Sequence, residues 1–237
     1  TQFITDAGVH GVFVCGTTGE FVNLTLEERK RLLTAAVEGA GPESCILFNT
    51  TAMNLADMKE LFDWARHEGA HAVTAPYYHS YDAETLTAYF RKAAELAEGM
   101  PLYLYNMPGM THNPITPKVV QEVCDTCPNV AGLKDSSMDF LTFQEFQCLE
   151  LPEGFELITG NDAQVLPVLQ SGGDGAIIAM ASVFPKQCQQ LWDYYYAGEL
   201  EQARRIQRML LKLRGLVRSV MPVMAHKKML ELQGFHM

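Results

Sequence analysis

The 237-residue sequence lacks the features that mark several large classes of protein. Its hydrophobic runs are short, and none approaches the roughly 20 consecutive apolar residues that a membrane-spanning helix requires. Charged residues make up only 19% of the chain, and 28 acidic against 18 basic residues give a formal net charge of -10. An acidic chain repels polyphosphates, and its basic residues are scattered except between Arg204 and Arg218. We therefore expect a soluble protein that binds neither membranes nor nucleic acid.

The six cysteines and seven histidines lack the spacing of a structural or metal site. The cysteines lie mostly within apolar runs, without the dense pattern of a secreted disulfide scaffold, so we expect reduced thiols and a cytoplasmic protein. Cys124 and Cys127 form a CxxC motif without a second pair, which favours core or helix-end thiols over a metal or redox site. The histidines show neither HExxH nor another ligand spacing, so we expect no metal.

Short apolar runs alternate with amphipathic segments along the whole chain. This alternation is typical of repeated strand–helix units that build a parallel sheet. The runs are apolar throughout, as expected for strands with helices on one face and packed side chains on the other. We predict seven strands, at residues 11–15, 45–49, 72–75, 102–105, 130–134, 156–159 and 175–179.

Helix-start signals separate these runs. Thr25 and Glu28 form a capping box, Asn54 and Asp82 are in N-cap positions, and Thr116 precedes a proline at the first helical position. After the last strand the chain continues as predicted helices at residues 184–197, 200–220 and 225–232.

The repeated units predict an α/β fold, a (β/α)8 TIM barrel with C-terminal helices. A barrel of this type closes with eight strands, whereas the sequence offers seven. The chain opens at Thr1 with neither an initiator methionine nor a signal-peptide pattern, and residues 1–7 resemble the end of a helix. We therefore expect the first strand to be missing, either because the natural N-terminus is absent or because the barrel is incomplete. Residues 1–180 are assigned to the barrel core from its second strand onward, and residues 181–237 to the last barrel helix and a C-terminal helical extension.

The first polar motif of interest follows the first predicted strand. In βα barrels the active site forms at the carboxyl ends of the strands, so polar residues there are candidates for function. Gly16-Thr17-Thr18-Gly19-Glu20 occupies such a position, and its glycines let backbone amides and both hydroxyls turn toward an anion such as a carboxylate. Taken alone, a Gly-Thr turn is more often purely structural.

Lys134 and Tyr105 end two further predicted strands. Lys134 closes the apolar run at residues 130–133, where packing does not explain an ammonium group. Partial desolvation there favours the neutral amine, which can attack a ketone carbonyl; the alternative is a stem that snorkels to solvent. Tyr105 leads into Asn106-Met107-Pro108-Gly109, which places its phenol at the barrel rim, although an ordinary core aromatic residue fits the pattern equally well.

Five motifs together resemble the dihydrodipicolinate synthase and N-acetylneuraminate lyase family across nearly the whole chain. They occur in the order and at the strand ends typical of that family of Schiff-base pyruvate aldolases. Their pattern is closest to the branch that cleaves 2-keto-3-deoxy sugar acids. The motifs are Gly16-Thr17-Thr18-Gly19-Glu20, Pro76-Tyr77-Tyr78, Tyr105-Asn106-Met107-Pro108, Gly132-Leu133-Lys134-Asp135 and Gly172-Gly173-Asp174-Gly175-Ala176-Ile177.

The resemblance implies a pyruvate-dependent lyase or aldolase that needs no metal or organic cofactor. Lys134 would condense with the ketone of pyruvate or another 2-oxo acid, and the protonated imine would stabilise a carbanion at C3. Tyr105 corresponds to the proton shuttle of the family, with Thr18 and Tyr78 as its relay. In relatives the tyrosine at the Tyr78 position reaches into a neighbouring subunit, and a homotetramer is implied.

The same resemblance assigns substrate-binding positions. Gly16, Thr17 and Thr18 would hold the substrate carboxylate, and the backbone carbonyl of Ile177 would face the site. Met110 departs from the family, because dihydrodipicolinate synthases usually carry there an arginine that binds the carboxylate of the second substrate. A thioether cannot make that bidentate ion pair.

Met110 therefore favours reversible cleavage of a 2-keto-3-deoxy sugar acid to pyruvate and an aldehyde. The enzymatic alternatives are 4-hydroxy-tetrahydrodipicolinate synthase (dihydrodipicolinate synthase) and N-acetylneuraminate lyase, which share the lysine chemistry. An alternative from a different class is an inactive barrel that binds 2-oxo acids without turnover.

Overall fold

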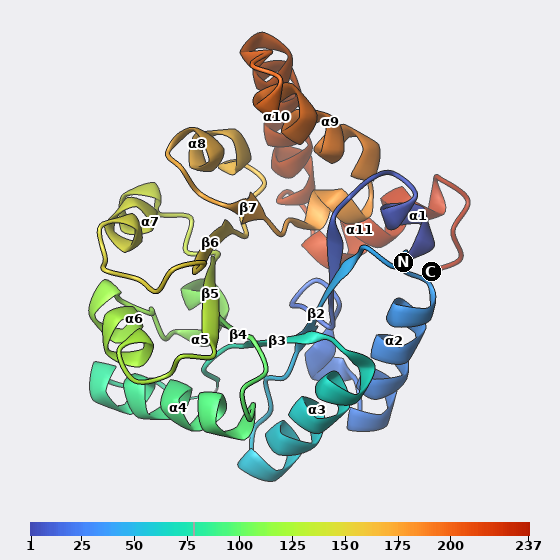
Figure 1. Cartoon of the computed structure of the whole chain (residues 1–237). Coiled ribbons are helices and arrows are strands. Elements are labelled where there is room, and N and C mark those ends of the chain that lie inside the picture. Colours follow the sequence, from blue (N-terminus) through green and yellow to red (C-terminus); the bar gives the residue numbers. More distant parts are fainter. Residues whose placement is uncertain (78) are drawn as a thin grey trace.

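The computed structural model describes residues 1–77 and 79–237. A curled parallel sheet of seven strands lies at the centre of this part of the chain (Figure 1). The strands pair in chain order, and among these residues no pairing joins the last strand to the first. The sheet and its outer helices confirm the predicted α/β barrel fold, and the open edge is consistent with a missing first strand. The strands are β1 (Gly11–Val14), β2 (Cys45–Asn49), β3 (His71–Thr74), β4 (Leu102–Asn106), β5 (Val130–Asp135), β6 (Glu156–Thr159) and β7 (Gly175–Ala176).

Helices cover the outside of this sheet, and their starts match the capping signals of the sequence. The Thr25 hydroxyl accepts from the Glu28 amide while the Glu28 carboxylate accepts from the Thr25 amide, so the predicted capping box is present. The side chains of Asn54, Asp82 and Thr116 each accept from a backbone amide three residues later and so cap the helices that follow them. The barrel helices are α2 (Leu26–Glu38), α3 (Leu55–Glu68), α4 (Ala83–Leu96), α6 (Pro117–Cys124), α7 (Phe140–Gln147) and α8 (Val165–Gln170), with short turns at α1 (Gln2–Thr5), η1 (Phe21–Asn23) and α5 (Pro108–Thr111).

The C-terminal helices occupy the side of the ring between β7 and β1 (Figure 1). They follow the short turn η2 and pack with α8 in a second hydrophobic cluster, which includes Leu166, Leu191 and Leu210. The predicted last strand was too long: only Gly175 and Ala176 pair with β6, so the strand ends after two residues. These elements are η2 (Ala179–Ser182), α9 (Pro185–Tyr196), α10 (Leu200–Val217) and α11 (Pro222–Glu231).

The main core lies between the sheet and the helices α2 to α7. Its largest side chains are fully buried aromatic rings, and a smaller cluster, which includes Tyr105 and Phe13, fills the inside of the curled sheet. Cys124 and Cys127 are buried free thiols at the end of α6, as the helix-end interpretation predicted. The buried rings of the main core are Phe48, Phe62, Phe90, Phe143 and Phe146.

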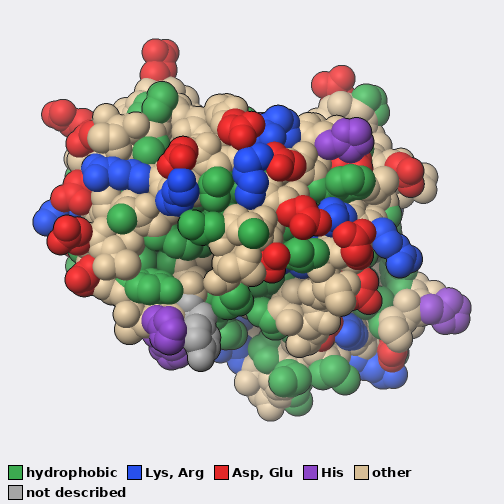
Figure 2. All heavy atoms as spheres, turned by 90° about the horizontal axis from the view of Figure 1, so that it is seen from below, with side chains coloured by type: hydrophobic (Ala, Val, Ile, Leu, Met, Phe, Trp, Pro, Cys, Tyr) green, Lys and Arg blue, Asp and Glu red, His purple; other side chains and the backbone are tan. Residues whose placement is uncertain are grey.

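The outer surfaces of the helices carry interspersed charges of both signs. Figure 2 shows this for the face that looks downward in Figure 1. Lys30 of α2 pairs with Glu60 of α3, and Arg66 of α3 pairs with Glu98 after α4, so ion pairs link neighbouring helices. Within the described part of the chain, no helix is both long and apolar enough to cross a membrane.

Candidate active site

Lys134 and Tyr105 meet inside the curled sheet at the carboxyl ends of β5 and β4. The two residues are register partners in the paired strands, and they are only 5% and 3% exposed. Lys134 Nζ lies 3.8 Å from the centroid of the Tyr105 ring and 4.9 Å from that of Phe13 on β1. An ammonium held over two aromatic faces is stabilised by cation–π attraction. The alternative of a stem that snorkels to solvent is therefore wrong, whereas Tyr105 is a buried ring of the inner cluster and also a direct neighbour of Lys134.

The Tyr105 phenol is surrounded by groups that favour its ionised form. Burial by itself raises the pKa of Tyr105, but the nearby Lys134 ammonium and hydrogen bonds with Thr17, Lys134 and Ser136 lower it. The net result is a pKa below the ordinary value for tyrosine. A phenol with a lowered pKa beside an amine can exchange protons with groups bonded to that amine.

Thr17 is the threonine that reaches Tyr105. Its Oγ1 lies 3.2 Å from the Tyr105 hydroxyl, and it also forms a hydrogen bond with the Tyr77 hydroxyl. Thr18, the neighbouring residue for which the relay role was predicted, is exposed. The three hydroxyls of Tyr105, Thr17 and Tyr77 therefore form a connected chain.

Tyr77 was not assigned a role from the sequence, although a signal for it exists. Its side chain packs with the inner cluster that also contains Val73 and Ala75. In an extended segment every second side chain faces the same way, so the alternation 73, 75, 77 identifies Tyr77 as inward-facing. Tyr78, which the family resemblance assigned to the relay, lies outside the described residues. The homotetramer that the same resemblance implied stays a prediction.

The loop that follows β1 packs tightly against the barrel. A Cβ at the buried Gly16 would lie 2.9 Å from the Phe13 ring, so the close approach requires glycine there. Glu20 adopts a left-handed conformation with φ 55, and its carboxylate lies 2.5 Å from Lys227 Nζ of α11. The C-terminal helix α11 is thus joined to the loop that carries Thr17. No local sequence signal could have identified Lys227, because this contact spans most of the chain.

Gly160, directly after β6, leaves room for the lysine. A Cβ at this position would lie 1.9 Å from Ser136 Oγ and 3.2 Å from Lys134 Cε. The missing side chain at position 160 therefore determines where Ser136 and Lys134 can lie.

Replacing Gly160 with Ala should push both neighbours aside and slow imine formation by about 100-fold, the cost typical of a displacement near 1 Å. The measurement is the rate at which borohydride traps an adduct with pyruvate. Gly175→Ala on the adjacent strand is a matched control, since a Cβ there meets nothing within 4 Å. Equal trapping rates in the two variants would show that the close contact has no functional role.

A buried pair of polar residues fixes the two strand ends behind the site. Asn106 and Asp135 are register partners one residue beyond Tyr105 and Lys134, and Asn106 Nδ2 donates to Asp135 Oδ1 at 2.7 Å. The Ser137 hydroxyl donates to the other carboxylate oxygen at 2.9 Å. Burial raises the pKa of Asp135 above its usual range, although the hydrogen bonds from Ser137 and Asn106 oppose this shift. The pair holds β4 and β5 in the register that brings Tyr105 and Lys134 together.

The two remaining predicted residues lie in different surroundings. The Ile177 side chain packs against the inner cluster, and its amide donates to the Thr159 carbonyl at 2.8 Å. Met110 lies in α5, directly after β4, and is 55% exposed. The structure thus places an exposed apolar side chain where the resemblance led us to expect an arginine.

A buried lysine in contact with a tyrosine at the strand ends of a barrel fits a carbon–carbon lyase that acts through a lysine Schiff base. The chain matches the model of the "Dihydrodipicolinate synthetase family" over residues 1–237, and it belongs to that family. The enzyme class predicted from the sequence is therefore confirmed.

Individual relatives agree with this assignment. The chain is 34% identical over 236 residues to a 4-hydroxy-tetrahydrodipicolinate synthase of Methanoculleus marisnigri, covering 98% of this chain and 80% of the relative. It is 35% identical over 211 residues to the enzyme of that name from Thermus thermophilus, covering 88% and 70%. A prophage protein of the dihydrodipicolinic acid synthase family from E. coli K12, solved in complex with pyruvate, matches with a TM-score of 0.89 and 28% identity, over 97% of this chain and 78% of that one.

Proposed function

We propose that the protein joins pyruvate to an aldehyde, or reverses that reaction, through an imine on Lys134. The observation that carries the proposal is the buried contact of Lys134 with Tyr105, whose hydroxyl is bonded to Thr17. In the unprotonated form, the Lys134 amine adds to the C2 carbonyl of pyruvate, and loss of water from the carbinolamine gives the protonated imine. Loss of a proton from C3 then yields an enamine, which is the carbon nucleophile.

The remaining steps form the new bond and release the product. C3 of the enamine attacks the aldehyde carbon, and the resulting alkoxide takes up a proton. Water then hydrolyses the imine, which frees Lys134 and the product. Each of these steps needs a proton donor or acceptor close to the reacting atoms.

Tyr105 is the group in position to move these protons. Its phenol contacts the Lys134 amine, and its lowered pKa brings the ionised form closer to neutral pH. We assign the relay to Thr17 instead of Thr18, because the hydroxyl of Thr17 connects Tyr105 with Tyr77. The backbone amides around Gly16 and the hydroxyl of Thr18 remain the groups proposed to hold the pyruvate carboxylate.

The identity of the aldehyde is the point on which two observations differ. Both curated relatives described above are named 4-hydroxy-tetrahydrodipicolinate synthase, which supports condensation with aspartate semialdehyde. Met110 favours the second candidate, cleavage of a 2-keto-3-deoxy sugar acid, because it cannot pair with a carboxylate. We favour the synthase reaction, because the similarity extends over nearly the whole chain whereas Met110 is one position.

Substrate profiling separates the two candidates. We expect kcat/KM for pyruvate with aspartate semialdehyde to exceed that for cleavage of 2-keto-3-deoxygluconate by at least about tenfold, a difference of about 1.4 kcal/mol. The opposite ratio would favour the sugar-acid reaction. An imine with pyruvate but turnover of neither substrate would identify a barrel that only binds 2-oxo acids.

A further inference from the structure

Two arginines of α10 converge on the loop that follows the imine lysine. Arg214 Nη2 lies 2.9 Å from the sulfur of Met138, and Arg218 Nη1 lies 3.8 Å from the same atom. Met138 comes four residues after Lys134, in the loop between β5 and α7, where it holds a left-handed φ of 66. The sulfur of methionine is a weak acceptor, so it satisfies two guanidinium groups poorly.

These two guanidinium groups lack an anionic partner in hydrogen-bond contact. Neither Arg214 nor Arg218 forms an ion pair with a carboxylate in the part of the chain that the structure describes. The two like charges also repel each other. Asp162 attracts Arg214 from a greater distance, but its Oδ1 accepts from the Met180 amide at 3.1 Å. An unpaired arginine pair of this kind is suited to a bidentate anion.

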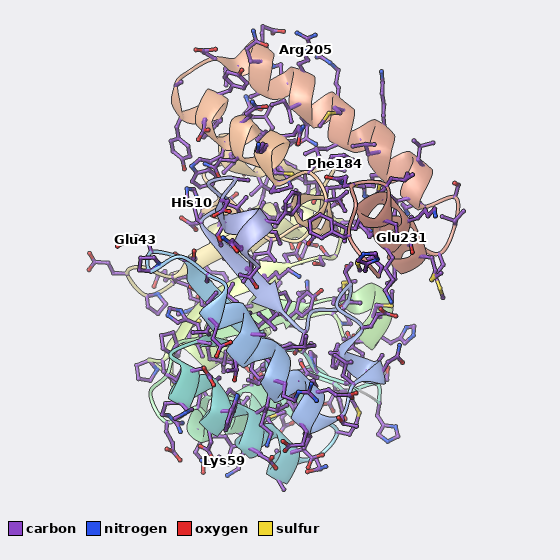
Figure 3. All side chains as sticks on the ribbon, turned by 90° about the vertical axis from the view of Figure 1, so that its right-hand side faces the viewer. His10, Glu43, Lys59, Phe184, Arg205 and Glu231 are labelled. Atoms are coloured by element: carbon purple, nitrogen blue, oxygen red, sulfur yellow. The ribbon has the colours of Figure 1, made fainter. Side chains whose placement is uncertain are left out.

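The arginine pair contacts a loop that is joined to the surroundings of Lys134. The loops after β5 and β6 flank Lys134, since Gly160 of the second loop approaches Lys134 Cε. Gln164 Nε2 donates to the Met138 carbonyl at 3.2 Å and so ties the two loops together. Figure 3 shows α10, on which Arg205 is labelled, running across the molecule toward the side where Glu231 marks α11, the helix that contacts the Thr17 loop. Arg214 and Arg218 thus contact a loop that starts close to Lys134 and is tied to the second loop beside it.

We propose that Arg214 and Arg218 form a subsite for a carboxylate or phosphate group at the far end of the aldehyde partner. An incoming anion would replace the Met138 sulfur as the acceptor of both guanidinium groups. The subsite would supply on α10 the positive charge that Met110 does not supply after β4. This inference rests on the proposed imine chemistry of Lys134 and specifies the class of its second substrate.

The test uses two ketones that differ only in a terminal carboxylate, 2-oxoheptanedioate and 2-oxoheptanoate. Both can form an imine with Lys134, and borohydride reduction followed by mass spectrometry quantifies the adduct. In the wild type we expect 2-oxoheptanedioate to reach half-maximal trapping at a concentration at least about tenfold lower than 2-oxoheptanoate requires. The double variant Arg214→Gln/Arg218→Gln should lose this preference. Arg205→Gln/Arg208→Gln, with the same charge change elsewhere on α10, should keep it.

The outcomes separate this inference from the proposed function. If both ketones are trapped on Lys134 but the double variant keeps the wild-type preference, the subsite is refuted while the imine chemistry stands. If neither ketone is trapped on Lys134, both proposals fail. Condensation rates with pyruvate then distinguish a carboxylate subsite from a phosphate subsite. The pair 4-oxobutanoate and butanal tests for a carboxylate preference, and the pair glyceraldehyde 3-phosphate and glyceraldehyde tests for a phosphate preference. Loss of either anionic preference in the double variant supports the subsite, and retention of both contradicts it.

Discussion

Replacing Tyr105 with Phe should lower the rate of condensation by about 100- to 10,000-fold, the usual contribution of a positioned proton-transfer group. The ring that lies over Lys134 Nζ is kept, so the amine stays buried and an adduct with pyruvate should still form slowly. The variant loses only the hydroxyl that is bonded to Thr17. The expected phenotype is therefore a large fall in kcat with a retained imine.

The pH dependence gives this prediction a second readout. Because the Tyr105 pKa is lowered, the wild-type rate profile should contain a titration below the ordinary tyrosine value of about 10, and the Phe variant should lack it. Tyr103→Phe is the matched control, because Tyr103 lies on the same strand and in the same inner cluster but donates to Glu156. A similar loss of rate in both variants would mean that the Tyr105 hydroxyl has no special role.

Replacing Lys134 with Met should abolish turnover and also stabilise the fold. The side chain is 5% exposed, and no ion pair of Lys134 with a carboxylate occurs among the described residues. Burial of an ammonium without a carboxylate partner costs free energy, which the two aromatic faces and the hydrogen bond with Tyr105 offset only in part. Methionine keeps the length and removes the charge, so the free energy of unfolding should rise by about 1 kcal/mol.

Denaturant unfolding of the two proteins measures this difference. Lys118→Met serves as the control, because the side chain of Lys118 is 74% exposed and its replacement should change stability by less than about 0.5 kcal/mol. A Lys134→Met protein that unfolds more easily than the wild type would show that the ammonium supports the fold. In that case burial of the Lys134 ammonium would not lower the free energy of unfolding, contrary to this prediction.

The strands and most helix starts could be predicted from the sequence because their signals are local. The run before Lys134 is apolar on both faces, and Thr25 and Glu28 cap their helix through neighbouring residues. The end of the last strand could not be predicted, since it is set by the pairing with β6, in which only Gly175 and Ala176 take part. Strand length at an edge depends on which neighbours are present, and a single segment does not carry that information.

Only part of the candidate site could be predicted from the sequence. Lys134 and Tyr105 became candidates because both end a predicted apolar strand, and the carboxyl ends of parallel strands in a barrel converge. Their roles came from the family resemblance. The choice between Thr17 and Thr18 required the direction of each side chain, which the sequence of two adjacent threonines does not define. Arg214 lies far along the chain from Lys134, so no sequence spacing relates them.

The central claim is that Lys134 bonds covalently to a 2-oxo acid. Incubation of the protein with pyruvate and borohydride, followed by digestion and mass spectrometry, tests it directly. The structure predicts a reduced pyruvate adduct on the peptide that contains Lys134, and no adduct there in Lys134→Met. An unmodified Lys134, or an adduct confined to surface lysines such as Lys118, would contradict the proposed mechanism.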